Sequence, residues 1–130
     1  RRSSDLRTSN KFCVVCNRET FHDYITEIWH QPTITVVVIN RFQQVSPGRY
    51  TKYKTVEYCN SCIFLPGFKG SLVGLIFHNG HTLTSGHYKA AVHASACWYC
   101  CDDHIISLVD NITSFIQNND TYLAFYVKQL

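Results

Sequence analysis

A histidine and two carboxylates lie where a short hairpin would bring them together. His87 opens one strand-like run rich in aromatic and small apolar residues, and Asp102 and Asp103 follow the next such run. The small residues 94–96 between the two runs suit a tight turn. A carboxylate that faces one imidazole nitrogen fixes the ring tautomer and stabilises the imidazolium, so the other nitrogen is free to act as a base. This pattern predicts a histidine–carboxylate pair suited to general acid–base chemistry.

The length of the turn decides which acid faces the histidine. A two-residue turn at 94–95 places His87 opposite Asp102, and a three-residue turn at 94–96 places it opposite Asp103. Either acid would be within reach, because residues directly opposite on one face of a hairpin have Cβ atoms only about 5 Å apart. On residue types alone, a structural pair at the rim of a sheet is the commoner interpretation, since perturbed pairs are often structural.

Alternation along the first strand predicts which way the histidine points. His87 has the opposite parity to Tyr88, Ala90 and Val92, which we expect to face the core of the protein. The imidazole of His87 should therefore point away from the core side of the hairpin.

The composition is that of one modest domain. The chain has 130 residues, of which 45% are hydrophobic and 14% aromatic, enough for a single core. The net charge is +3 with only 16% charged residues, so no basic stripe indicates a nucleic-acid partner. No apolar run approaches the roughly 20 residues of a membrane-spanning helix, so we expect no membrane partner either. Because the sequence lacks methionine, we expect a fragment or a chain incomplete at its N-terminus.

The seven cysteines indicate metal binding rather than disulfides. Their number is odd, and Cys13 and Cys16, like Cys59 and Cys62, form a Cys-x-x-Cys pair, which is typical of a reducing, intracellular compartment. Cys13 and Cys16 can both reach one Zn²⁺, but a structural zinc site needs four ligands. The sequence allows a four-cysteine site completed by Cys59 and Cys62. For the five cysteines beyond Cys16 we prefer another interpretation, that they are small buried apolar residues on strands.

Strands account for most of the remaining predicted elements. The β-branched run 34–39 predicts a central strand covered on both faces, and the polar, turn-rich segment 43–53 predicts a loop. Residues 111–117 predict one or two helical turns capped by Asp110 or Asn111. Three further strands are predicted at 71–78, 105–109 and 121–127.

Several short segments form an ordered set along the chain. They are Cys13-Val14-Val15-Cys16, the strand that ends Ile39-Asn40-Arg41-Phe42, His78-Asn79-Gly80, Ser85-Gly86-His87-Tyr88, the segment 98–103 and the segment 122–126. In this order and with this spacing, they resemble the C-terminal half of the catalytic domain of ubiquitin-specific proteases. The resemblance extends over residues 11–128, nearly the whole chain.

The resemblance implies a fold and a domain organisation. We expect an α+β, mostly antiparallel β structure: the palm of a papain-like cysteine peptidase with the end of a zinc-ribbon fingers region, as a partial domain. Residues 1–10 would be a flexible N-terminal segment, and residues 11–130 the C-terminal portion of the catalytic domain. The N-terminal half of that domain would then be a partner of this chain. A second Cys-x-x-Cys in that half completes the zinc site of the family, so Cys13 and Cys16 would form half of a structural site.

The resemblance also assigns roles to the residues of the predicted hairpin. His87 would act as general base and acid, and Asp102 would orient it, because the family places Asp or Asn at that position. Asp103 would match a second acid of the family. The nucleophilic cysteine of the family lies in a Gly- and Asn-rich box that opens a helix, and these residues contain no such box. We therefore expect the segment to be inactive by itself, without the nucleophile or the oxyanion hole.

Four further residues would line the channel for the substrate. Phe42 ends a strand that borders this channel in the family, and His78 precedes the second of its two loops. Gly86 follows that loop, where the lack of a side chain would let a substrate backbone come close to His87. Such a site suits a partner that ends in glycines, and Tyr88 completes the motif.

These implications combine into one functional hypothesis. The chain would be part of a deubiquitinating cysteine peptidase of the cytoplasm or nucleus that hydrolyses the bond after the C-terminal glycine of ubiquitin, with ubiquitin and ubiquitinated proteins as its partners. A catalytically dead or truncated ubiquitin-binding module is the alternative, because Cys101 stands where the family prefers an aromatic residue. A small zinc-ribbon interaction domain unrelated to peptidases is a third hypothesis.

Overall fold

Antiparallel strands make up most of the protein. The computed structural model describes residues 7–25, 28–54, 61–65 and 67–130. Within these ranges every strand pair is antiparallel, so the mostly antiparallel β fold predicted from the sequence is confirmed. Of the N-terminal segment expected to be flexible, residues 7–10 belong to a strand and the rest lies outside the described residues.

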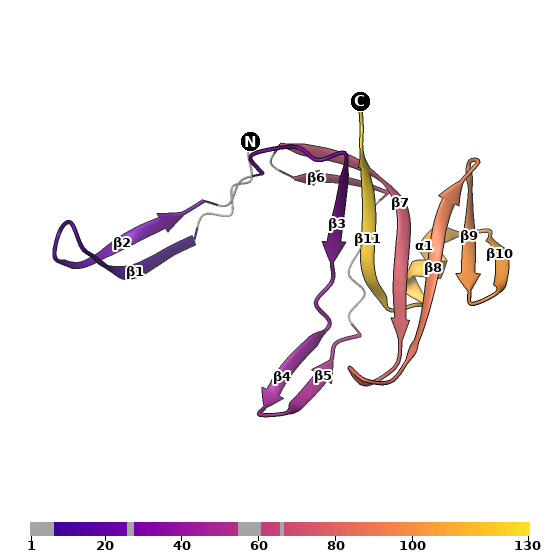
Figure 1. Cartoon of the computed structure of the whole chain (residues 1–130), viewed down its shortest axis with the longest axis horizontal. Helices are drawn as coiled ribbons and strands as arrows, with labels where there is room; N and C mark the ends of the chain where they lie inside the picture. The colour runs from indigo at the N-terminus through magenta and orange to yellow at the C-terminus, as the bar shows by residue number, and fades with distance from the viewer. Residues whose placement is uncertain (1–6, 26–27, 55–60, 66) are drawn as a thin grey trace.

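A seven-stranded sheet forms the body of the molecule (Figure 1). Its strands follow the order β10-β9-β8-β7-β11-β3, and β6 pairs with the first part of β7. Aromatic and β-branched residues, which suit a pleated surface, are frequent in these strands. The strands are β3 (Ile34–Val38), β6 (Cys62–Leu65), β7 (Phe68–Asn79), β8 (His87–Ala94), β9 (Cys97–Asp102), β10 (Ile105–Val109) and β11 (Thr121–Lys128). The three strands predicted at 71–78, 105–109 and 121–127 are thus confirmed.

Two separate hairpins accompany the sheet. One consists of β1 (Arg7–Cys13) and β2 (Arg18–Tyr24), and it projects away from the large sheet in Figure 1. The other consists of β4 (Phe42–Ser46) and β5 (Arg49–Lys52) and follows β3 in the chain. The prediction of a loop at 43–53 is therefore wrong for most of that segment. A two-stranded ribbon that is exposed on both faces lacks the apolar alternation by which strands are recognised.

The core lies on one face of the sheet. Leu75 and Phe77 of β7 and Ala91 of β8 are at most 1% exposed. The helix α1 (Ile112–Gln117) packs against these residues, and the ring of Phe115 meets that of Phe77 edge-on at 5.4 Å between centroids.

The helix begins where the sequence indicated. The Asn111 side chain accepts a hydrogen bond from the backbone N–H of Ser114 at 2.9 Å, so Asn111, one of the two candidates, is the cap. No helix in the described part of the chain has the length and apolar character to cross a membrane.

The opposite face of the sheet is partly uncovered, which corrects two predictions. Val36 and Val38 of β3 are 47% and 60% exposed, and β3 lies at the edge of the described sheet, so the expected central strand covered on both faces is wrong. In β8, Ala91 is buried whereas Val92 is 42% exposed. The core side of this hairpin is therefore the face of Ala91, and by alternation of His87, not the face of Tyr88. An apolar run identifies a strand but does not reveal which of its faces is covered.

Candidate active site

The turn between β8 and β9 sets the register of the predicted pair. Ala94 pairs with Cys97, so Ser95 and Ala96 form a two-residue turn. Both have positive φ angles, 49° and 64°, as a type I′ turn requires. The two registers predicted from the sequence are both wrong, because the turn starts one residue later than the two-residue alternative. Neither Gly nor Asn marks this turn, so the sequence carries no usual signal for its position.

His87 and Asp102 meet in spite of the different register. Extending the register one pair beyond Ala90 and Cys101 places Lys89 opposite Asp102, so His87 is its diagonal neighbour. Diagonal neighbours across a hairpin are within reach of long side chains. The Nε2–H of His87 donates a hydrogen bond to Oδ1 of Asp102 at 2.5 Å, and Lys89 Nζ lies 3.7 Å from Oδ2 of the same carboxylate.

The pair is electrostatically coupled and open to solvent. The hydrogen bond that His87 donates to Asp102 raises the pKa of His87 above the ordinary value for imidazole. The same contact holds the pKa of the Asp102 carboxyl below its usual value. The two side chains are 47% and 37% exposed, so a reacting group has access to them. Because Nε2 is used by the carboxylate, Nδ1 is the nitrogen that remains for chemistry.

Asp103 lies beside this pair at the end of the same strand. It has a positive φ of 51° in the turn that leads from β9 to β10. His87, Asp102 and Asp103 each offer one nitrogen or oxygen atom, and these three atoms lie within 4.8 Å of one another. Among the described residues, no other group of three or more His, Cys, Asp or Glu side chains comes together in this way. The structure thus brings together the three residues for which the sequence predicted acid–base roles.

A second cluster surrounds His78, at the end of β7. Its ring centroid lies 4.7 Å from that of Tyr88 and 6.0 Å from that of Phe42. His78 is only 5% exposed, and burial of the ring, with a smaller contribution from the positive charge of Lys52, lowers the pKa of His78. The imidazole is therefore neutral in an aromatic setting.

Gly86 joins the two clusters. A Cβ at this position would overlap the His78 ring and lie 2.9 Å from the carbonyl oxygen of Asn79. Only glycine permits the backbone to pass so close to the imidazole, and the next residue is His87. The four residues predicted to line a substrate channel, Phe42, His78, Gly86 and Tyr88, therefore lie together, and Gly86 directly precedes the predicted base in the chain.

Cys13 and Cys16 lie apart from these clusters, at the tip of the β1–β2 hairpin. The backbone N–H of Cys16 donates to Cys13 Sγ at 3.5 Å, and this contact lowers the pKa of the Cys13 thiol. The arrangement suits a two-thiolate metal knuckle, with two of the four donors that structural zinc takes. Cys62, the described member of the other pair, belongs to β6, and Cys59 lies outside the described residues.

A comparison with known families identifies the chain. The sequence model of the family described as ubiquitin carboxyl-terminal hydrolase matches residues 6–126. The chain belongs to this family. The resemblance inferred from the ordered motifs is thereby confirmed.

Curated ubiquitin carboxyl-terminal hydrolases match almost all of this chain. It is 27% identical to ubiquitin carboxyl-terminal hydrolase 25 of Arabidopsis thaliana over 97% of its length and 20% of that protein. It is 28% identical to ubiquitin carboxyl-terminal hydrolase 17-like protein A of Mus musculus over 98% of its length and 26% of that protein. The chain thus spans about a fifth to a quarter of the length of these curated relatives.

Solved structures show the same fold. A SAGA DUB module containing Ubp8, bound to monoubiquitin, matches with a TM-score of 0.72 at 19% sequence identity, over 98% of this chain and 31% of the other. A second such module, bound to ubiquitin aldehyde, matches with a TM-score of 0.63 at 19% identity, over 99% of this chain and 32% of the other. The strands described above are therefore a partial fold of the ubiquitin-specific protease type.

Sequence reasoning missed two charged residues of this ubiquitin carboxyl-terminal hydrolase chain. Lys52 and Asp120 form an ion pair of 2.8 Å next to His78, and the Lys52 side chain is only 3% exposed. Lys52 occurs in a polar segment read as a loop, where a lysine is ordinarily solvated. The opposite charge is 68 positions away (120 − 52), so no local pattern connects them.

Proposed function

We propose that this chain supplies the acid–base half of a cysteine-peptidase site that hydrolyses the bond after the C-terminal glycine of ubiquitin. The observation that carries the proposal is the His87–Asp102 hydrogen bond, next to Gly86 and the aromatic cluster around His78. Membership in the ubiquitin carboxyl-terminal hydrolase family supports it. The relatives matched by this chain are four to five times longer, so we propose that residues 11–130 act as the C-terminal portion of a catalytic domain.

In the proposed reaction His87 moves the protons. Its Nδ1 takes the proton of a cysteine thiol, and the thiolate attacks the carbonyl carbon of the terminal glycine. The imidazolium, stabilised by Asp102, then gives its proton to the leaving amine as the carbon–nitrogen bond breaks. Water, deprotonated by His87, attacks the resulting thioester and releases the free carboxylate. Asp103 adds negative charge near the imidazolium and helps to hold it protonated.

The nucleophile is proposed to come from outside this chain. No described cysteine joins the group formed by His87, Asp102 and Asp103. Cys100 is buried, and burial raises the pKa of its thiol, which disfavours the thiolate. The Gly- and Asn-rich cysteine box that the family resemblance implies would supply both the thiolate and the oxyanion hole.

The channel residues suit a narrow, flexible tail. Gly86 brings the backbone against the His78 ring, and Tyr88 is 56% exposed beside it. We propose that His78, Phe42 and Tyr88 form an apolar wall for the glycines at the end of ubiquitin. This wall would position the scissile carbonyl next to His87.

The cysteines support two further proposals, one for a zinc ion and one for the cellular compartment. We propose that Cys13 and Cys16 hold a structural zinc ion together with two ligands from outside this chain. Six cysteines in the described residues are free thiols, which supports an intracellular, reducing compartment in the cytoplasm or nucleus.

The test uses the full-length protein that contains this chain and a ubiquitin probe with a thiol-reactive C-terminus. We expect covalent labelling by the probe and turnover of a ubiquitin conjugate, with turnover lowered by several orders of magnitude in His87→Ala because triad members act as a unit. His93→Ala, at the exposed far end of the same strand, is the matched control and should retain activity. Binding of ubiquitin without labelling or turnover would support the alternative of a catalytically dead binding module.

A further inference from the structure

We propose that Lys52 is a positioning residue for substrate binding: its buried ammonium anchors the loop 80–86 that holds Gly86 against the His78 ring. The proposal rests on the function proposed above and concerns the same site. Lys52 touches no reacting group, so its effect is exerted through the backbone of this loop.

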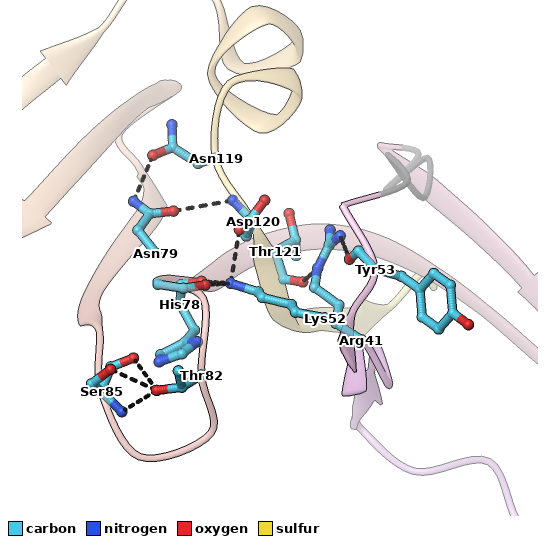
Figure 2. Close-up of polar contacts among 11 residues, drawn as sticks. Arg41, Lys52, Tyr53, His78, Asn79, Thr82, Ser85, Asn119, Asp120 and Thr121 are labelled. Atoms are coloured by element: carbon cyan, nitrogen blue, oxygen red, sulfur yellow. Dashed lines mark hydrogen bonds and ion pairs between the residues drawn. The ribbon is translucent and has the colours of Figure 1, made fainter. Parts of the chain in front are cut away.

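The Lys52 ammonium is enclosed by three acceptors. It donates to the carbonyl oxygen of His78 at 2.6 Å and pairs with Asp120 Oδ2 at 2.8 Å (Figure 2). It also donates to the carbonyl oxygen of Gly80 at 2.7 Å. An ammonium has three donors, and these contacts use all of them. The side chain is 3% exposed and its Nζ lies 5.8 Å from the centroid of the Phe42 ring. A cation held in this way fixes the relative positions of three segments of the chain.

The segments that carry the acceptors of Lys52 are held by further hydrogen bonds. The backbone N–H of Asp120 donates to Asn79 Oδ1 at 3.2 Å, and Asn79 Nδ2 donates to Asn119 Oδ1 at 3.1 Å. Arg41 Nε donates to the carbonyl oxygen of Thr121 at 2.6 Å (Figure 2). Lys52 therefore connects the β4–β5 hairpin to a rigid junction between β7 and β11.

The anchor reaches the candidate site through the ends of the loop. A Cβ on Gly80 would lie 2.6 Å from the carbonyl oxygen of Ser85 and 2.7 Å from Cα of Gly86, so the two ends of the loop touch. Within the loop, Thr82 Oγ1 accepts from the backbone N–H of Ser85 at 3.0 Å. Holding the carbonyl of Gly80 therefore holds Gly86 against the His78 ring.

Lys52 also acts on the imidazole that faces Gly86. Its charge lowers the pKa of His78, second to burial, and Asp120 opposes this effect. The Nδ1 atom of His78 is buried without a hydrogen-bond partner, so a protonated ring would be poorly satisfied there. Lys52 thus favours the neutral, apolar character of the channel wall.

The His87–Asp102 pair does not depend on this anchor. The pair is held by the β8–β9 hairpin, whereas the acceptors of the Lys52 ammonium belong to His78, Gly80 and Asp120, none of which lies in β8 or β9. Loss of the ammonium should therefore weaken substrate binding while the acid–base chemistry of bound substrate persists. This separation distinguishes positioning from a general loss of stability.

The test compares Lys52→Met with Lys54→Met, an exposed lysine two residues away, in the full-length protein. Active sites are counted with the ubiquitin probe, and KM and kcat are measured on a ubiquitin conjugate. We expect Lys52→Met to raise KM about tenfold, the order expected when a substrate-contacting loop loses a charge-assisted anchor. The kcat per active site and the pH dependence of kcat should stay near wild type, and Lys54→Met should match wild type throughout.

Other outcomes separate the two proposals. Suppose that the wild type turns over the conjugate and that Lys52→Met has an unchanged KM. This result would overturn the positioning role alone, and so would a variant that differs from wild type only in having fewer active sites. If Lys52→Met does not fold, the same measurements are made on Asp120→Asn, which removes only the charge of the partner. We then expect a smaller rise in KM, and an unchanged KM would overturn the positioning role. A wild-type protein that neither cleaves nor binds ubiquitin would overturn the proposed function and this role together.

Discussion

Replacing Asp102 separates two contributions that the carboxylate makes to His87. Asp102→Asn keeps an oxygen that accepts from the Nε2–H of His87 but removes the negative charge, whereas Asp102→Ala removes both. In the structure the contact is short, 2.5 Å, and it is the main cause of the raised pKa of His87. The asparagine variant therefore tests charge, and the alanine variant tests charge and orientation.

The expected magnitudes follow from the protonation state of the ring. An imidazole with its ordinary pKa of about 6.5 is only about 10% protonated at pH 7.5. Asp102→Asn should thus lower the protonated fraction of His87 at pH 7.5 by at most about tenfold. Asp102→Ala also frees the ring to rotate, so we expect kcat/KM to fall by about 10²- to 10⁴-fold, the range that positioned acid–base catalysis supplies.

The pH dependence has a definite sign. The folded pKa of His87 is raised, so the ion pair is fully formed below about pH 6.5 and is lost as pH rises through that folded value. The folded pKa of Asp102 is lowered, so its contribution is present above about pH 4 and is lost as pH falls through its folded value. The His87–Asp102 ion pair is thus present between these two limits. Because the proposed reaction starts from a neutral imidazole, the acid limb of kcat/KM reports the pKa of His87, and this limb should move to lower pH in both variants.

The assay is the pH profile of kcat/KM on a ubiquitin conjugate, with the full-length protein and with Asp110→Ala as an exposed acidic control. Selective ¹³C labelling of histidine rings, with His87→Gln for assignment, gives the pKa of His87 directly by NMR. An acid limb that does not move in Asp102→Asn, or a loss of only a few-fold in Asp102→Ala, would refute the assignment of Asp102.

Three further predictions concern other parts of the structure. Gly86→Ala should abolish tight binding of ubiquitin, because the new methyl group overlaps the His78 ring, and isothermal titration with ubiquitin would measure this; unchanged affinity would contradict the close approach. Cys16→Ser should lower the zinc content of the full-length protein as measured by elemental analysis, whereas Cys97→Ser, an exposed thiol elsewhere, should not; equal zinc content in both would refute the knuckle. Phe77→Ala should lower the free energy of unfolding by about 3–5 kcal/mol in urea titrations, because the ring is fully buried against α1, and a loss below about 1 kcal/mol would place the core elsewhere.

Much of the fold could be predicted from local patterns. The strands of β7, β8, β9, β10 and β11 coincide with apolar or aromatic runs, and Asn111 caps the helix as its residue type suggests. Local patterns could not reveal which faces of the strands are covered by the rest of the protein. The β-branched residues of β3 identify a strand, but its place at the sheet edge depends on which partners pair with it. The faces of β8 were assigned wrongly for the same reason, since Ala91 is buried in the core cluster that includes Ile116 of α1, whereas Val92 is 42% exposed.

The candidate site shows a similar limit. An acid could be paired with His87 from the sequence because Asp102 and Asp103 are adjacent, so each of the two predicted registers placed one of them opposite the histidine. The actual register was not predictable, because Ser95 and Ala96 adopt left-handed conformations that these residue types rarely signal. Lys52 was missed because its partners come from distant segments, and only the folded chain shows that a lysine of a polar hairpin is buried.

The diagonal placement of His87 and Asp102 makes the length of one tiny turn more important than its composition. Inserting or deleting a single residue at 95–96 would slide β9 by one position and rotate every one of its side chains to the reverse surface of the sheet. The acid would then point away from the imidazole although both residues were still present. Relatives should therefore tolerate many residue types at these two positions but no insertion or deletion. A relative with an insertion or deletion there should lack the contact between the histidine and the acid.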